Sequence, residues 1–301
     1  MVLDRLKPIG VNLYDKLWED SMVRIITDSA ADFEPAELEQ KNIICIPLKV
    51  LFGEAEYEEN INLTKDQFYE NMLAFQGFLK TSQAAPSVLA GLFEVAKAAG
   101  DEVIYFTLSS ALSGTSQSAM FIREDVGYEK AWVVDSRNAT GGQRMLVEYA
   151  VRLRDAGKCA ADIVAEVEAL RERIVLYACI NTLEYLYRGG RISHLSYTLG
   201  TLAQIKPIIH VDHMGRVDIP AKTMGMRKGV EHLCKQADAK TPDPEFPLYV
   251  MYTNDRSAAE NLAVRLAEHG HAIHPDNIIQ VGAAIGSHVG PAACGLVYVG
   301  K

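Results

Sequence analysis

Residues 102–118 read EVIYFTLSSALSGTSQS, and this stretch decides the fold class. Its first six residues form an apolar, β-rich run without polar alternation, which is typical of a strand buried on both faces of a parallel sheet. The run ends in a loop of serine, glycine and threonine that opens a helix. A strand, a short loop and a helix in succession form the repeating unit of an α/β sandwich.

The same pattern extends outward from this stretch. Apolar runs of strand length occupy residues 23–27, 43–51 and 131–135. Helix candidates lie between them, and Thr64 and Thr140 each begin a pattern with the spacing of a capping box. The alternation predicts an α/β/α sandwich with a mainly parallel sheet for residues 22–157.

The pattern changes after Gly157. Residues 205–211 and 216–222 flank the turn sequence DHMG and predict a β-hairpin. Helices are expected over residues 162–173 and in a short segment that ends at Arg188; further strands are expected over 175–180, 248–252, 278–281 and 296–299. A hairpin among crossover units predicts a second α/β domain with a mixed sheet over residues 158–301.

The composition excludes several classes of function. The 301 residues are 49% hydrophobic and 23% charged, as in ordinary globular proteins. A net charge of −9 argues against a general affinity for nucleic acid or anionic membranes, because both require a basic surface. Any bound anion would therefore be held by local donors.

Cysteine usage and the N-terminus favour a cytoplasmic protein. The cysteines are scattered, odd in number and never spaced as CxxC, which indicates reduced thiols. No apolar stretch reaches the roughly 18 residues of a membrane span. Residues 1–21 lack the apolar core of a signal peptide and are interpreted as a short N-terminal extension.

Three loops place small and hydroxyl residues at predicted strand ends, with sequences TSQAAPS from residue 81, LSSALSGTSQS from 108 and GSHVGP from 286. The second is the most informative. A loop that opens a helix exposes backbone N–H groups at the positive end of the helix dipole, which suits carboxylate or phosphate oxygens. Gly114 permits close approach and Ser113 adds a hydroxyl donor. Taken alone, however, a Ser-Gly-Thr segment usually only caps a helix, here through Ser113 or Thr115.

Other residues allow different chemistry. Ser113, His288 and an acid such as Asp28 could form a catalytic triad, since triads are defined by geometry, although GxSxG and SxxK signatures are lacking. A serine acyl hydrolase is therefore the alternative function. Arg188 and Arg191 flank two glycines and would suit phosphate or carboxylate, although a helix C-cap gives the same pattern.

The remaining polar residues suggest structural roles. His269, His271 and His274 are interpreted as solvated, because a carboxylate or cysteine at ligand spacing does not accompany them. Asp28 and Asp135 end predicted strands and are expected to orient loops at the carboxyl edge of the sheet. We expect neither a metal nor a cofactor.

Taken together, the segments resemble the DegV family of bacterial fatty-acid-binding proteins from Met22 onward. The resemblance is carried by short motifs in order along the chain: ITDSAAD from residue 26, IPLKV from 46, KTSQ from 80, LSSALSGTSQS from 108, VDS from 134, TLEYL from 182, RGGRIS from 188, IKPI from 205 and GSHVGP from 286. Here Ala84 and Ala85 replace the proline and serine that usually follow Thr-Ser-Gln in the family.

The resemblance implies a fatty acid held between two domains, with its tail in an apolar cavity. It implies that Thr81 and Ser113 bind the carboxylate, that the Gly114 amide assists, and that Arg191 and His288 lie nearby. Arg188 would be a contact for a partner or a phosphate. The protein would then be a carrier rather than an enzyme, with the fatty acid as its ligand and a fatty acid kinase as its partner. A phosphotransfer subunit is a further possibility, because dihydroxyacetone kinases contain a domain that resembles this fold.

Overall fold

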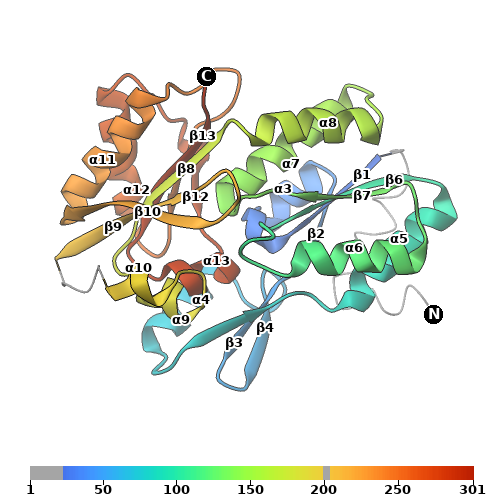
Figure 1. The fold of residues 1–301 in the computed structure, drawn as a ribbon, viewed down its shortest axis with the longest axis horizontal. Coiled ribbons are helices and arrows are strands. Elements are labelled where there is room, and N and C mark those ends of the chain that lie inside the picture. Colours follow the sequence, from blue (N-terminus) through green and yellow to red (C-terminus); the bar gives the residue numbers. More distant parts are fainter. Residues whose placement is uncertain (1–22, 199–203) are drawn as a thin grey trace.

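The computed structural model describes residues 23–198 and 204–301, and Figure 1 shows the path of the chain. The N-terminal extension predicted for residues 1–21 lies outside the described residues. Helices with the length and apolar character of a membrane span are absent from the described part of the chain.

The first sheet is parallel and four-stranded, as the apolar runs predict. Its strand order is β2-β1-β6-β7, with β1 (Val23–Asp28), β2 (Ile43–Ile46), β6 (Glu102–Thr107) and β7 (Ala131–Asp135). Every residue of β1 is buried, because helices cover both faces of this sheet. One face packs on α5 (Pro86–Ala99) and α6 (Thr115–Val126); the other packs on α3 (Pro35–Gln40), α7 (Thr140–Asp155) and α8 (Ala160–Arg171).

The single strand expected over residues 43–51 is wrong. The chain leaves the parallel sheet after β2 and enters a separate antiparallel sheet at β3 (Lys49–Phe52). Pro47 lies at the break and has no N–H to give to a strand ladder. The order of this sheet is β4-β3-β5, with β4 (Ala55–Glu58) and β5 (Leu79–Ser82); α4 (Lys65–Ala74) lies between these two strands in the sequence.

The third sheet is mixed, as the hairpin among crossover units predicts. Its order is β10-β9-β8-β13-β11-β12, with β8 (Ile174–Cys179), β9 (Ile205–Val211), β10 (Val217–Met224), β11 (Tyr249–Tyr252), β12 (Ile278–Gln280) and β13 (Cys294–Val299). The β11–β12 pair is parallel and the other pairs are antiparallel. The predicted hairpin is confirmed as β9 and β10.

Helices and short turns complete this part of the chain. One face of the mixed sheet packs on α11 (Met226–Ala239) and α12 (Arg256–Glu268). The connections contain η2 (Ser29–Ala31), α9 (Glu184–Arg188), α10 (His194–Thr198), η3 (Pro275–Asn277) and α13 (Ala283–Val289). The short helix expected to end at Arg188 is confirmed as α9.

The two predicted capping boxes have different outcomes. Thr64 caps α4, because its hydroxyl accepts from Gln67 N at 3.2 Å and the Gln67 side chain accepts from Thr64 N at 3.0 Å. The box at Thr140 is wrong, because Thr140 is already the first residue of α7. The Gln143 side chain reaches β1 instead and donates to Asp28 Oδ1 at 2.9 Å, so it cannot fold back onto the helix start.

Helix α7 lies between the parallel sheet and the mixed sheet (Figure 1). Gly141 allows this packing, since a Cβ there would lie 2.5 Å from Val297 Cγ1. One continuous hydrophobic core contains residues of both halves, including Ile25 and Val297. The division into domains 22–157 and 158–301 stays a prediction.

Candidate ligand-binding site

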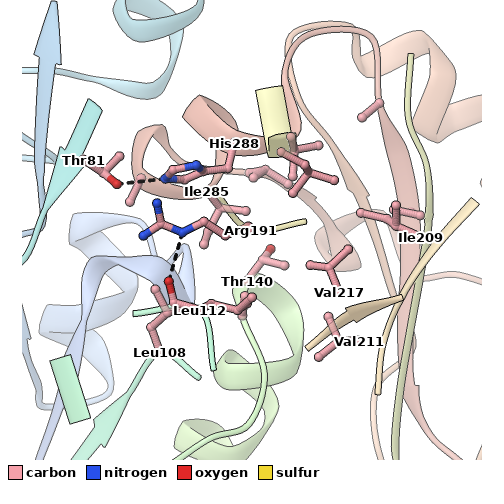
Figure 2. A pocket seen from close by; sticks show the side chains of 18 of the residues that line it. Thr81, Leu108, Leu112, Thr140, Arg191, Ile209, Val211, Val217, Ile285 and His288 are labelled. Carbon is pink, nitrogen blue, oxygen red and sulfur yellow. Dashed lines mark hydrogen bonds between the residues drawn. The ribbon is translucent and has the colours of Figure 1, made fainter. Parts of the chain in front are cut away.

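A cavity of about 360 Å³ lies where the loops of the parallel sheet face the mixed sheet and α13 (Figure 2). This volume is within the range of roughly 300–1,000 Å³ that is usual for small-molecule sites. Most of the lining is apolar: Leu48, Leu108, Leu112, Leu176, Leu186, Ile209, Val211, Val217, Met251, Val281, Ile285 and Val289. Thr81, His288 and Arg191 lie together at one end, away from Ile209, Val211 and Val217 (Figure 2), so the cavity suits a long apolar molecule with one polar end.

The structure brings the predicted site residues together from separate parts of the chain. Thr81 lies on β5, Ser113 and Gly114 lie in the loop between β6 and α6, and His288 lies on α13. Arg191 follows α9, and all five residues line the same cavity.

Arg188 is placed differently from the other predicted residues. Its guanidinium lies over the ring of Phe78, with 3.5 Å from Cζ to the ring centroid. It also forms an ion pair with Glu184 at 2.6 Å. Arg188 therefore lies outside the cavity lining and remains partly exposed.

His288 and Thr81 are joined by a hydrogen bond of 2.8 Å between Nε2 and Oγ1 (Figure 2). Burial and the nearby charge of Arg191 lower the pKa of His288 to about 3, so the imidazole is neutral at pH 7. Its Nδ1 is buried and lacks a hydrogen-bond partner among the described residues.

The surroundings of Nδ1 favour one tautomer of His288. A buried N–H without an acceptor is rarer in proteins than an acceptor without a donor. We therefore assign the proton to Nε2, which donates to Thr81 Oγ1. In this tautomer the Thr81 hydroxyl keeps its own proton for donation to a ligand oxygen.

Helix capping by Ser113 or Thr115 is wrong, because Gly114 is the N-cap residue of α6 and Thr115 is already the first residue of the helix. The Ser113 Oγ lies 2.8 Å from Thr115 Oγ1 and accepts from Thr115 N at 3.3 Å, which is a local turn before the helix. It also lines the cavity. A Cβ added at the neighbouring Gly114 would meet no described atom within 4 Å, so open space lies beside this backbone.

Arg191 supplies positive charge at the polar end of the cavity. Its guanidinium donates to two backbone carbonyls, Gly189 O at 2.6 Å and Leu112 O at 3.0 Å, and Figure 2 shows the second of these bonds. Half-burial lowers its pKa, but an arginine stays charged at neutral pH. Acidic partners within ion-pair distance of Arg191 are absent from the described chain, which favours an anionic ligand.

The aspartates that end β1 and β7 hold the loop that contains Ser113. Asp28 Oδ2 accepts from Leu108 N at 2.8 Å, and Asp135 Oδ1 accepts from Ser110 N at 3.0 Å. The predicted role of both aspartates as loop-orienting groups is confirmed.

Sequence reasoning missed the buried carboxylates that hold α13. Glu59 accepts from Ser29 Oγ at 2.6 Å, from Ala284 N at 3.4 Å and from Ala283 N. Asp32 Oδ1 accepts from Gly282 N at 2.9 Å. These bonds fix the start of the helix that carries His288. Glu59 lies in the acidic segment EYEEN, and local sequence does not distinguish it from its exposed neighbours.

The residues named for a catalytic triad do not form one. His288 bonds to Thr81 rather than to Ser113, and its lowered pKa makes it a weak base. The Asp28 carboxylate is engaged by Leu108 N and the Gln143 side chain. The contact between nucleophile and base that a serine hydrolase requires is therefore missing from this arrangement.

The three histidines near residue 270 lie away from the cavity. His269 Nδ1 and His271 Nε2 both bond to Asp238, at 2.7 and 3.1 Å. His274 is exposed and accepts from Asp276 N. Within the described ranges, groups of three or more side chains suited to a metal ion are absent.

A family model and individual relatives of known sequence all place similar proteins in one family. Residues 22–301 match the model of a family described as "Uncharacterised protein, DegV family". A DegV domain-containing protein of Clostridium perfringens is 31% identical over 92% of this chain and 97% of its own length. A DegV domain-containing protein of Caldanaerobacter subterraneus is 29% identical over 93% of this chain and 99% of its own length.

Solved structures share the fold over nearly the whole chain. DegV of Bacillus subtilis, described as a fatty acid binding protein, is 29% identical with a TM-score of 0.80, and the match covers 94% of this chain and 100% of that one. A DegV family protein of Thermus thermophilus, described by its fatty acid binding, is 28% identical with a TM-score of 0.83. That match covers 93% of this chain and 99% of the other.

Proposed function

This chain belongs to the DegV family, and we propose that it binds one long-chain fatty acid in the cavity described above. The observation that carries the proposal is the division of this cavity into an apolar body and one polar end, with an arginine that has no acidic partner among the described residues. The fatty acid binding described for the relatives from B. subtilis and T. thermophilus supports the same ligand. We call this space the acyl cavity.

Burial of the tail would supply most of the affinity. A long-chain fatty acid has about fourteen or more methylenes, and each contributes roughly 0.8 kcal/mol when it is buried. The gross gain is on the order of 11 kcal/mol before the cost of association is subtracted. The polar end would then determine orientation.

We assign the carboxylate to the polar end, with hydrogen bonds from the Thr81 and Ser113 hydroxyls and from the Gly114 amide. Arg191 would balance the charge from nearby, while His288 would fix the Thr81 hydroxyl. Neutral donors hold a carboxylate without a closed, buried ion pair, which makes release less costly. The lining of the cavity and the tautomer of His288 support this assignment.

We further propose that the protein is a cytoplasmic carrier that presents its fatty acid to a fatty acid kinase for conversion to an acyl phosphate. In this role the partner supplies the chemistry. Arg188 would lie on the contact surface, since its guanidinium is partly exposed over Phe78. Addition of such a kinase and ATP to the loaded protein, with detection of acyl phosphate, tests the carrier role.

The binding proposal is tested by the lipid that accompanies the protein. We expect protein purified from a bacterial host to release about one fatty acid per chain on organic extraction, detected by mass spectrometry. Delipidated protein is expected to take up palmitate or oleate. Protein that carries no lipid and ignores both acids would contradict the proposal.

Gly189→Ala is expected to weaken palmitate binding about tenfold through His288. The backbone at Gly189 has φ −72°, which suits alanine, but a Cβ there would lie 2.1 Å from His288 Nδ1. The ring would have to move and lose its bond to Thr81, worth roughly 1 kcal/mol or more. Calorimetric titration measures the effect.

A double-mutant cycle shows whether this effect passes through the imidazole. In a His288→Ala background the clash with the imidazole disappears and a close contact of 3.0 Å with Tyr185 O remains, so Gly189→Ala should then change the affinity by less than about twofold. An equal loss in both backgrounds would show that Gly189 acts by another route.

A further inference from the structure

A second cavity of about 360 Å³ lies where β8 begins and β9 ends, and it extends over the face of these strands that is opposite to the acyl cavity. Side chains alternate between the two faces of a strand. Leu176 and Ala178 of β8 line the acyl cavity, whereas Tyr177 lines the second cavity and stacks on His210 at 4.4 Å. We call this second space the distal cavity.

The distal cavity has a different chemical character from the acyl cavity. Its lining includes Arg137, Arg171, Asp212 and Lys240, and Arg137 forms an ion pair with Glu172 at 3.0 Å. A methylene group that entered this space would meet these charged side chains as well as apolar ones such as Ile174 and Val175. It would therefore gain less of the free energy that apolar burial provides than it gains in the acyl cavity.

Val211 borders both cavities. Among the residues that the structure describes, it is the one that lines both. It pairs across the hairpin with Val217, which also lines the acyl cavity. Figure 2 shows both valines, together with Ile209, on the side of the cavity away from Thr81 and His288. With the carboxylate at Thr81, the methyl end of a bound tail would lie toward these residues.

Hydrogen bonds hold the turn that follows Val211, so Val211 cannot easily be displaced. Asp212 N donates to Arg216 O at 2.9 Å, and Gly215 N donates to Asp212 O at 2.8 Å. Ser109 Oγ donates to Gly215 O at 2.8 Å and ties the hairpin to the parallel sheet. Gly215 has φ +77°, and a Cβ there would lie 2.2 Å from Ser109 Oγ.

We propose that Val211 sets the upper limit on the length of the acyl chain that this protein binds. The inference rests on the proposed function and names the side chain that selects among fatty acids. A tail that ends at Val211 is enclosed by apolar groups. A longer tail would have to bend back within the cavity or displace Val211 and enter the distal cavity.

The inference is tested with delipidated wild type, Val211→Ala and Val211→Leu, titrated with laurate, myristate, palmitate, stearate, arachidate and behenate. While the tail stays within the apolar wall, each added methylene should raise the affinity roughly fourfold. The increase should stop at a limiting length. Val211→Ala should move this limit to longer acids and raise the preference for arachidate over palmitate about tenfold. Val211→Leu should move the limit to shorter acids.

Val167→Ala is the matched control, because Val167 is fully buried in the same hydrophobic core and lies outside both cavity linings. It should lower stability without moving the limiting length. The same limit in wild type, Val211→Ala and Val211→Leu would overturn the inference and leave the proposed function intact. A wild type that binds none of the acids would overturn both.

Discussion

Replacement of Thr81 by valine together with Ser113 by alanine is expected to weaken palmitate binding about a hundredfold or more. Both hydroxyls line the polar end of the acyl cavity. A hydrogen bond to a charged group contributes roughly 1.5–3 kcal/mol, and two such bonds would be lost. Valine keeps the shape of threonine, so the apolar lining should stay intact. Isothermal titration of delipidated protein measures the change.

Ser118→Ala is the control for this pair, because Ser118 lies on α6 next to the site but outside the cavity lining. It should leave the affinity unchanged within about twofold. Denaturation curves should show that the double variant is folded. A folded double variant that binds palmitate as tightly as wild type would refute the assignment of the carboxylate to Thr81 and Ser113.

Glu59→Leu is expected to lower the free energy of unfolding by about 3–5 kcal/mol. The Glu59 carboxylate is buried and accepts hydrogen bonds from Ser29 Oγ and from the N–H groups of Ala283 and Ala284. Leucine would leave these donors buried and unpaired, at roughly 1–3 kcal/mol each before relaxation. Urea denaturation measures the loss. Glu54→Leu is the control, because Glu54 is an exposed turn residue, and it should change stability by less than about 0.5 kcal/mol.

The same carboxyl group should make stability depend on pH. Burial, followed by the charge of Asp32, raises the pKa of Glu59 from 4.5 to about 7. The folded state therefore binds this proton more tightly than the unfolded state. The stability that the protonated form contributes is fully present below about pH 4.5 and is lost as the pH rises through about 7.

Glu59→Gln removes this titration and keeps the shape of the side chain. The free energy of unfolding of wild type minus that of Glu59→Gln should fall by up to about 3 kcal/mol between pH 4 and pH 8, on the order of the rise in pKa. Denaturation at a series of pH values measures the difference. A constant difference across this range would mean that Glu59 keeps an ordinary pKa in the folded protein.

The buried carboxylates of Glu59 and Asp32 affect the geometry of the acyl cavity as well as the stability of the fold. Glu59 and Asp32 lie outside the cavity lining, yet they hold the start of α13, whose residues Ile285 and His288 line the acyl cavity. Polar groups that lie outside the cavity therefore determine where its imidazole points. This is a reason to measure ligand affinity as well as stability for every Glu59 variant.

Local physical chemistry allowed much of the fold to be predicted. Apolar runs without alternation identified β1, β6 and β7 as strands of a buried parallel sheet, and the turn at Asp212 identified the β9–β10 hairpin. Where local patterns failed, a single residue or a distant contact explains the error. Pro47 divides an apparently continuous strand, and Gln143 binds Asp28 rather than the start of its own helix.

The sequence by itself determined which chemical groups are available: hydroxyl and glycine loops at strand ends, a pair of arginines on a glycine turn, and the family to which they belong. Only the tertiary structure decided how these groups are used. It joined His288 to Thr81, held the pKa of that imidazole far below its usual value, and placed Arg188 on Phe78 outside the cavity. The physical reason is that hydrogen-bond partners and burial arise from segments up to 250 residues apart in the chain, and such contacts leave no periodic pattern in the sequence.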